Sequence, residues 1–354
     1  MKSLKTLFGP IALFGSGETS PAAQRIHQRV MEQLQTPIQA AIIETPAGFE
    51  PNAAAVAQKI ADYLQHRLQN FNPTCEQVAA RKRNSAYSPD DPAIAAPIWR
   101  ANYLFMGPGS PTYTVRQLTA SYTWHSLVAR HRLGAALCFS SAATIAIGKA
   151  AMPVYEIYKV GEDLHWKPGL DFFAAYNLDL VLVPHWNNND GGADLDTSHC
   201  YLGTERYNQL VDLLPATTAV LGIEENTGVI IDPKQGECEV VGAGAACVIH
   251  NGQERRFVAN DHFPVTALGD WCLPAAEEGI PAAIWQRGQE ALAEGAPKAS
   301  SPEAPAAILA LVEERTQART ARDWSKADQI RDQLAELGWQ VNDTPDGATV
   351  SPRS

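Results

Sequence analysis

The stretch "GAALCFSSAATIAIGKA", Gly134 to Ala150, decides how the fold is interpreted. A short apolar run, "AALCF", leads into two serines and then into small residues at helical spacing. This order predicts a buried strand, a sharp turn and a helix. Such a turn can present a nucleophilic side chain at the end of a strand. The plainer interpretation is a strand end followed by a helix with a serine cap.

Three side chains in this stretch are candidate nucleophiles. The turn brings the residues two before and two after the nucleophile together, so both must be small. Ser140 has Cys138 and Ala142 at these positions, whereas Ser141 would place the bulky Phe139 there. Cys138 as nucleophile would shorten the preceding strand to about three residues, and a typical length of ~5–6 residues places the bend at Ser140. We therefore predict Ser140 as the nucleophile.

Similar apolar runs recur along the chain, each followed by Gly, Pro or Asn and then by a helical stretch. Continuous apolar strands that alternate with helices predict an α/β fold with a doubly wound, mostly parallel sheet. After about Val220, turn signals such as "DPKQG" and "HNG" predict an antiparallel edge or hairpins. The runs are "IALF", "AAIIET", "NYLFMG", "AALCF" and "LVLVPH", and the helical stretches are 22–34, 52–68, 114–130 and 142–150.

Composition changes near the C-terminus. Residues 294–307, "EGAPKASSPEAPAA", are typical of a linker. We predict an α/β domain over 1–292, a linker over 293–305 and a small α-hairpin domain over 306–354. Apolar residues at helical spacing mark its second helix, Ser325 and Asp328 fit a capping box, and Gly338 stops it. These apolar residues are Ala327, Ile330, Leu334 and Leu337.

Bulk properties exclude several classes of protein. The net charge of −11 disfavours a nucleic-acid binder, which needs a basic face. The 6 cysteines include no CxxC pair and are best interpreted as reduced thiols of a cytoplasmic protein. Apolar runs stay shorter than the ~18 residues of a membrane span, and "IALF" is interpreted as a first strand rather than part of a signal peptide. Histidine and carboxylate spacing predicts no metal site, and we expect no cofactor.

Polar residues follow other predicted strands. His185 comes directly after "LVLVP", Glu224 and Glu225 follow "AVLGI", and Gly109 lies in "GPGS" after "NYLFM". Ligand-binding residues of α/β sheets gather at such strand ends. Each residue alone has an ordinary interpretation as part of a turn or a solvated bend. Together, Gly109, Ser140, His185 and Glu225 supply an oxyanion donor, a nucleophile, a base and an orienting acid.

These motifs resemble the aspartyl dipeptidase and cyanophycinase family of serine peptidases. The core of that family is similar to class I glutamine amidotransferases, so the resemblance implies a flavodoxin-like fold. The resemblance lies in "CFSSAA", "GPGS", "PHW" and "GIEENTG" and covers roughly residues 8–250. It implies a Ser140–His185–Glu225 triad and an oxyanion hole formed by the amides of Gly109 and Ser141.

The chain departs from the family pattern at Cys138, Ser141, Ala142 and Pro108. Three hypotheses follow. The first is a serine hydrolase that cleaves peptide or isopeptide bonds of small peptides, with aspartyl-containing peptides as one candidate class. The second is an amidotransferase-like enzyme with a Cys138 thiolate, and the third is an inactive pseudo-hydrolase that binds a ligand and serves as a scaffold.

The loop after His185 is expected to line the substrate site. Trp186, Asn187, Asn188 and Asn189 follow the histidine, and amide side chains can hold the polar groups of a peptide. We therefore predict these four residues as substrate-binding. A small peptide is the expected partner, and exposed sheet edges lead us to expect self-association.

The C-terminal segment carries a second resemblance. "ARDWSKADQIRDQLAELG" and "NDTPDG" are similar to the C-terminal part of cysteinyl-tRNA synthetases. In such an enzyme the segment would lie near tRNA. Residues 303–354 hold 6 Lys/Arg and 9 Asp/Glu here, which disfavours RNA binding. We interpret the segment as a docking module, with tRNA contact as the alternative.

Overall fold

The computed structural model describes residues 8–295, 306–321, 323–337, 339–344 and 347–352. The chain divides into two compact units, Met1–Leu292 and Ala293–Ser354. Each unit is described by itself.

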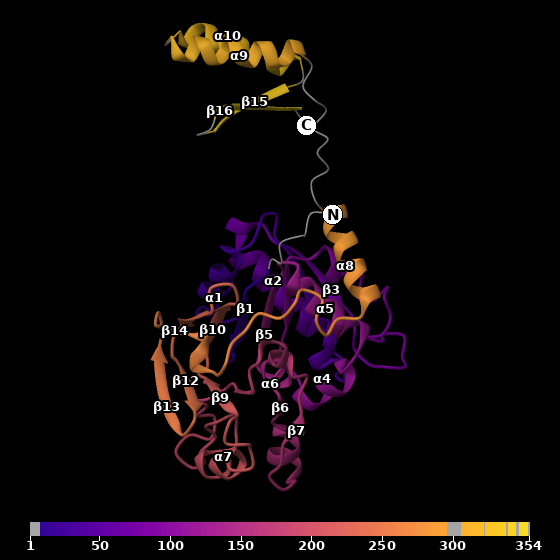
Figure 1. Cartoon of the computed structure of the whole chain (residues 1–354), viewed down its shortest axis with the longest axis vertical. Coiled ribbons are helices and arrows are strands. Elements are labelled where there is room, and N and C mark those ends of the chain that lie inside the picture. The colour runs from indigo at the N-terminus through magenta and orange to yellow at the C-terminus, as the bar shows by residue number, and fades with distance from the viewer. Residues whose placement is uncertain (1–7, 296–305, 322, 338, 345–346, 353–354) are drawn as a thin grey trace. The chain divides into compact units, whose positions relative to one another are not determined.

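A large, mainly parallel sheet forms the centre of the first unit (Figure 1). Its strand order is β14-β11-β10-β1-β5-β4-β2-β3, and the five strands from β1 to β3 are parallel. The parallel strands are β1 (Ile11–Phe14), β5 (Ala136–Ser140), β4 (Tyr103–Met106), β2 (Gln39–Ile43) and β3 (Thr74–Val78), and the antiparallel ones are β10 (Thr227–Asp232), β11 (Glu237–Gly242) and β14 (His262–Pro264).

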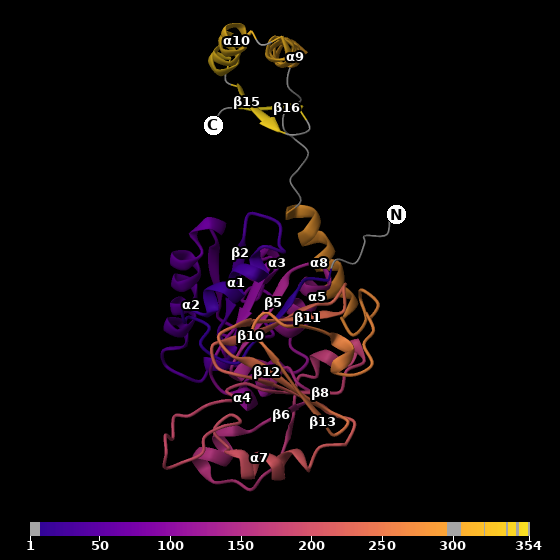
Figure 2. The same cartoon turned by 90° about the vertical axis from the view of Figure 1, so that its left-hand side faces the viewer.

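Helices cover both faces of this sheet, because alternate residues of each strand point to opposite sides (Figure 2). On one face Ala12 and Phe14 join a cluster with α1 (Ala23–Met31) and α2 (Ala53–Arg67). On the other face Ile11 and Leu13 join a cluster with α3 (Ala96–Arg100), α5 (Tyr122–Arg132) and η4 (Phe172–Tyr176). This layering explains why the parallel strands inside the sheet, β1, β5, β4 and β2, are largely apolar runs.

A second sheet departs from the single doubly wound sheet predicted above. Its order is β13-β12-β9-β8, with β8 and β9 parallel and the other pairs antiparallel. The free edge of β1 is taken by β10, which pairs Ile11 with Ile231, so β8 cannot add to the large sheet there. The strands are β8 (Leu180–Val183), β9 (Ala219–Ile223), β12 (Ala245–His250) and β13 (Gln253–Val258).

Two local predictions are wrong. The helix expected over 114–130 is two helices, α4 (Pro111–Leu118) and α5, because Ala120 has a φ of 54° and Ser121 accepts the amide of Trp124 as a cap. Strand β3 was not expected, since its "TCEQV" sequence is largely polar and lies at the sheet edge. The remaining elements of the unit are η1 (Thr45–Ala47), η2 (Gln69–Phe71), α6 (Ala142–Ala146), β6 (Ala150–Ala151), η3 (Glu156–Val160), β7 (Lys167–Pro168), α7 (Thr204–Val211), η5 (Val265–Ala267) and α8 (Ala282–Gly295).

The second unit contains two helices, α9 (Ala306–Thr320) and α10 (Trp324–Glu336), and a hairpin of β15 (Trp339–Thr344) and β16 (Gly347–Pro352). Helix α10 is capped by Asp323, whose side chain accepts the amide of Lys326 at 3.1 Å, so the Ser325 capping box is wrong by two residues. Residues 293–295 of the predicted linker belong to α8, and residues 296–305 lie outside the described residues. Gly338, the predicted stop of the second helix, also lies outside them.

Leu334 tests whether the second unit folds by its own core. It is fully buried against Ile308, Val312 and Ile330. We expect Leu334→Ala to cost about 2–5 kcal/mol and to unfold this unit while the melting of the first unit stays unchanged. Residue-resolved hydrogen exchange measures both units. The control Leu337→Ala removes a side chain that is 53% exposed and should change little. Loss of protection in the large sheet would contradict independent cores.

Candidate active site

The turn after β5 is strained at Ser141. Ser140 ends the strand and Ala142 begins α6, and Ser141 between them has φ 52° and ψ −113°. A serine in this region of backbone space costs of order 1–3 kcal/mol and persists only where its surroundings hold it, as at functional sites. The bend therefore falls one residue later than the sequence analysis placed it.

The serine that meets the histidine is Ser141 and not the predicted Ser140. The Ser141 Oγ lies 2.9 Å from Nε2 of His185. Ser140 is fully buried, and its hydroxyl donates to Oε2 of Glu18 at 2.7 Å. Because β5 pairs with β1 through Phe14 and Ser140, Ser140 still has strand geometry and points toward the face covered by α1 and α2.

The bulk of Phe139 does not prevent this arrangement. Its ring is 1% exposed and lies in the core of the opposite face, with its centre 6.2 Å from that of Phe172. The size rule applied in the sequence analysis assumes that the side chain stays near the turn. Here the strand turns it away, so a large residue fits two positions before Ser141.

His185 and Glu225 complete a hydrogen-bonded chain. His185 follows β8 and its Nδ1 lies 2.7 Å from Oε1 of Glu225, which follows β9. An ionised carboxylate only accepts hydrogen bonds, so Nδ1 carries the proton and Nε2 is left to accept the Ser141 hydroxyl. Glu224 is turned elsewhere, toward Arg256 and the amide of Ala245.

Glu225 is held in its ionised form. The hydrogen bond from His185 lowers its pKa below the ordinary value of 4.5, partial burial opposes this shift, and a 3.0 Å bond from Nδ2 of Asn188 reinforces it. The Glu225 amide donates to Oδ1 of Asn187 at 2.8 Å. Both asparagines therefore position the acid.

Several of the four residues predicted to bind substrate are committed to contacts within the protein. Asn188 is only 3% exposed and is committed to Glu225. Trp186 lies against the second sheet, where a Cβ on Gly222 would come within 2.2 Å of its ring. Of the four predicted residues, Asn187 and Asn189 are exposed, and Asn187 already accepts the Glu225 amide.

Gly109 has the geometry of an oxyanion-loop residue. Its φ is 147°, and a Cβ there would lie 2.0 Å from the carbonyl oxygen of Pro46, so only glycine fits. The next amide, of Ser110, donates to that same carbonyl at 2.9 Å. Within the described residues, the Gly109 amide has no backbone acceptor outside regular elements and remains available.

The second predicted oxyanion donor, the Ser141 amide, already has an acceptor within the protein. The amide of Ser141 donates to the carbonyl of Phe14 at 3.4 Å. With the bend at Ser141, the residue after it is Ala142, the first residue of α6. The amides of a first helical turn have no acceptor within the helix, so the Ala142 amide is the better candidate.

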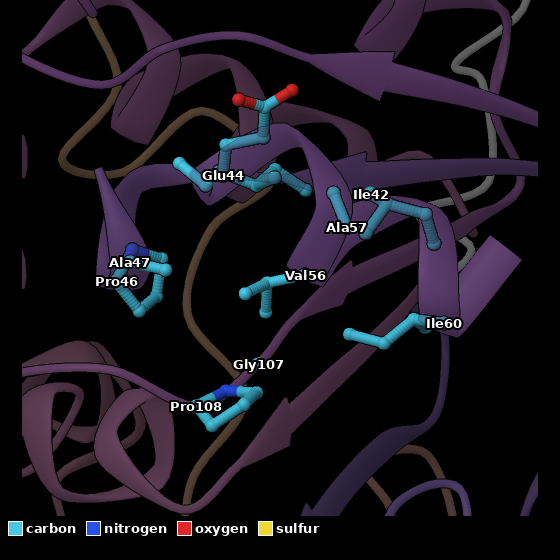
Figure 3. A pocket seen from close by; sticks show the side chains of 11 residues that line it. Ile42, Glu44, Pro46, Ala47, Val56, Ala57, Ile60, Gly107 and Pro108 are labelled. Atoms are coloured by element: carbon cyan, nitrogen blue, oxygen red, sulfur yellow. The ribbon is translucent and has the colours of Figure 1, made fainter. Parts of the chain in front are cut away.

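A mostly apolar pocket lies beside the oxyanion loop that contains Gly107 and Pro108 (Figure 3). Gly107 and Pro108 form one wall and α2 forms another. The Glu44 carboxylate points away from Val56 and Pro108 and pairs with Nε of Arg81 at 2.5 Å. The lining residues are Ile42, Ile43, Glu44, Pro46, Ala47, Ala53, Val56, Ala57, Ile60, Gly107 and Pro108.

The cysteine hypothesis is contradicted at Cys138. This residue is fully buried, and burial raises the pKa of its thiol to about 12. A protonated thiol within the core is neither a nucleophile nor within reach of a substrate. All 6 cysteines are free.

Two further searches concern the described residues alone. No group of three or more His, Cys, Asp or Glu among them is arranged to hold a metal ion. Nor does any helix in this part of the chain have the length and apolarity needed to cross a membrane.

Comparison with known proteins separates the two units. Residues 301–350 match the family described as cysteinyl-tRNA ligase anticodon binding domain. The cysteine–tRNA ligase of Caldicellulosiruptor saccharolyticus is 54% identical over 46 residues (13% of this chain, 10% of that protein), and that of Nitratidesulfovibrio vulgaris is 59% identical over 41 residues (12% and 8%). The chain thus spans about a tenth of the length of these curated relatives. The second resemblance is confirmed.

The first resemblance is supported at the level of the fold. A crystal structure of a peptidase from an acI-B1 Actinobacterium aligns with a TM-score of 0.58 at 17% identity. The alignment covers 73% of this chain and 98% of that one. The chain therefore has a mixed α/β fold like that peptidase.

Glu225 makes stability depend on pH. A carboxylate whose pKa is lowered on folding stabilises the folded state above its unfolded pKa and loses that contribution as the pH falls through the folded pKa. We expect wild type to exceed Glu225→Gln in free energy of unfolding above about pH 4.5, and the difference to shrink at lower pH. Urea denaturation across pH 3–7 measures this, and a pH-independent difference would refute the ionised Glu225.

Cysteine alkylation tests the burial of Cys138. In the native protein we expect iodoacetamide to modify the exposed Cys272 and to leave Cys138 unmodified until denaturant is added. Peptide mass spectrometry compares both sites in one sample, so Cys272 serves as the internal control. Rapid native labelling of Cys138 would revive the thiolate hypothesis.

Proposed function

We propose that the chain is a serine hydrolase that cleaves peptide or isopeptide bonds of small peptides. The observation that supports this most is the hydrogen-bonded chain Ser141–His185–Glu225 at a strained strand-to-helix turn. The peptidase-like fold agrees with the proposal. Aspartyl peptides are one proposed class of substrate.

The geometry provides for acyl transfer in two steps. The Ser141 Oγ attacks the carbonyl carbon while Nε2 of His185 takes the hydroxyl proton, and Glu225 holds the resulting imidazolium. The tetrahedral oxyanion accepts hydrogen bonds from the amides of Gly109 and Ala142. Each bond stabilises the transition state by about 3 kcal/mol by comparison with known hydrolases. His185 gives the proton to the leaving amine, and water then hydrolyses the acyl-enzyme by the same route.

Two companion proposals concern the rest of the chain. The second unit serves as a docking module, and the match to an anticodon binding domain makes tRNA the alternative partner. The free thiols favour a reducing compartment, which we propose to be the cytoplasm. The edge strand β13 exposes most of its residues, and self-association through such an edge remains a proposal.

Covalent labelling distinguishes the active hydrolase from the pseudo-hydrolase. We expect a fluorophosphonate probe to modify Ser141, and Ser141→Ala to lower the labelling rate at least 100-fold, because the activated hydroxyl is lost. The matched control Ser140→Ala removes the neighbouring hydroxyl, which bonds to Glu18, and should stay within about 3-fold of wild type. Label on Ser140, or no label on either serine, would overturn the proposal.

A further inference from the structure

Two tyrosine rings continue outward from the catalytic imidazole. The ring centre of Tyr201 lies 5.5 Å from that of His185, and the ring centre of Tyr158 lies 5.7 Å from that of Tyr201. Both tyrosines are half-buried, so each keeps part of its surface exposed to solvent, and Nζ of Lys159 lies 5.2 Å from the Tyr158 ring centre. We call Tyr201 and Tyr158 the tyrosine row.

Tyr201 is held in place by an unusual backbone. His199, Cys200 and Tyr201 all have left-handed φ angles, of 53°, 61° and 69°. The Cys200 amide donates to the carbonyl of His185 at 3.1 Å, and the Tyr201 hydroxyl donates to Oδ2 of Asp190 at 3.1 Å. Three strained residues in succession are costly, and they are stabilised here by contacts to the histidine that the proposed reaction uses.

Tyr158 comes from a different segment that is tied to the oxyanion loop. It lies in η3, where Oε1 of Glu156 accepts the hydroxyl of Thr112 at 2.7 Å. Thr112 belongs to α4, whose cap Ser110 directly follows Gly109. Figures 1 and 2 place β6, which precedes η3, and α7, which follows Tyr201, at the same end of the unit. The row is therefore positioned from both sides of the candidate site.

The chemistry assigns a side of the substrate to this row. In the proposed reaction His185 gives its proton to the leaving amine, so the residues attached to that amine lie on the imidazole side of the site. The two centre-to-centre steps of 5.5 and 5.7 Å correspond to the reach of about one to three extended residues. The row therefore borders the first residues beyond the bond that is cleaved.

We propose, resting on the proposed function, that Tyr201 and Tyr158 form the subsite for the leaving segment and select an aromatic residue there. Aromatic rings gain from offset or edge-to-face contact with other rings beyond the burial of area. Two of the three asparagines predicted for substrate binding, Asn187 and Asn188, are occupied with Glu225, whereas both tyrosines keep part of their surface exposed. Phenylalanine, tyrosine or tryptophan as the leaving residue should be preferred over alanine.

Matched dipeptides test the subsite. We expect kcat/KM for Asp-Phe over Asp-Ala, and for Ala-Phe over Ala-Ala, to favour the aromatic member by about 3- to 10-fold. Tyr158→Ala should reduce this ratio to less than 2-fold, and Tyr158→Phe should keep it, since the ring is retained. The control Tyr155→Ala removes an exposed tyrosine of the same segment that does not belong to the tyrosine row and should also keep the ratio.

A binding measurement separates the subsite from the catalytic proposal. Calorimetric titration of the Ser141→Ala variant with the same dipeptides should show tighter binding of the aromatic member, and Tyr158→Ala in that background should remove the difference. Hydrolysis by wild type without an aromatic preference, or a preference that survives Tyr158→Ala, would overturn the subsite alone. If the dipeptides are not hydrolysed but the aromatic one binds more tightly in a way that depends on Tyr158, the hydrolase proposal alone is overturned. If neither hydrolysis nor this binding preference is found, both proposals are overturned.

Discussion

A backbone hydrogen bond joins the two sheets where the candidate site is assembled. The His185 amide donates to the carbonyl of Gly15 at 3.1 Å, while the Gly15 amide donates to the carbonyl of Thr227 at 2.9 Å. Ser141 comes from the large sheet, and His185 and Glu225 follow strands of the small one. The close approach leaves no room for a side chain, since a Cβ on Gly15 would lie 2.1 Å from the carbonyl oxygen of Glu224.

The sequence predicts most of the parallel strands because burial on both faces requires a simple pattern of apolar residues. Strands covered on both faces are uninterrupted apolar runs, and β1, β2, β4, β5 and β8 were all placed from such runs. The division into two sheets has no such signal. The division depends on the pairing of Ile11 with Ile231, which are far apart in the chain. A run of apolar residues does not show which other strand it will pair with.

The site shows the same limit at finer scale. His185 and Glu225 could be placed because each follows a strand, but the choice between Ser140 and Ser141 depends on whether β5 ends one residue earlier or later. Successive strand residues point to opposite faces, so a shift of one residue exchanges a core contact for the candidate nucleophile. Asn188 was misjudged because polar residues in loops usually face solvent, whereas its partner Glu225 lies 37 positions away.

The seam between the sheets has a consequence for how the proposed activity would be lost. Reactive groups must be aligned to within a fraction of an ångström, and a displacement of about 1 Å can cost 10²-fold in rate. A small slip along the seam at Gly15 and His185 would leave both sheets and their hydrogen bonds intact. Under the proposed function, warming or mild denaturant would therefore lower turnover before circular dichroism registered any melting of the sheets.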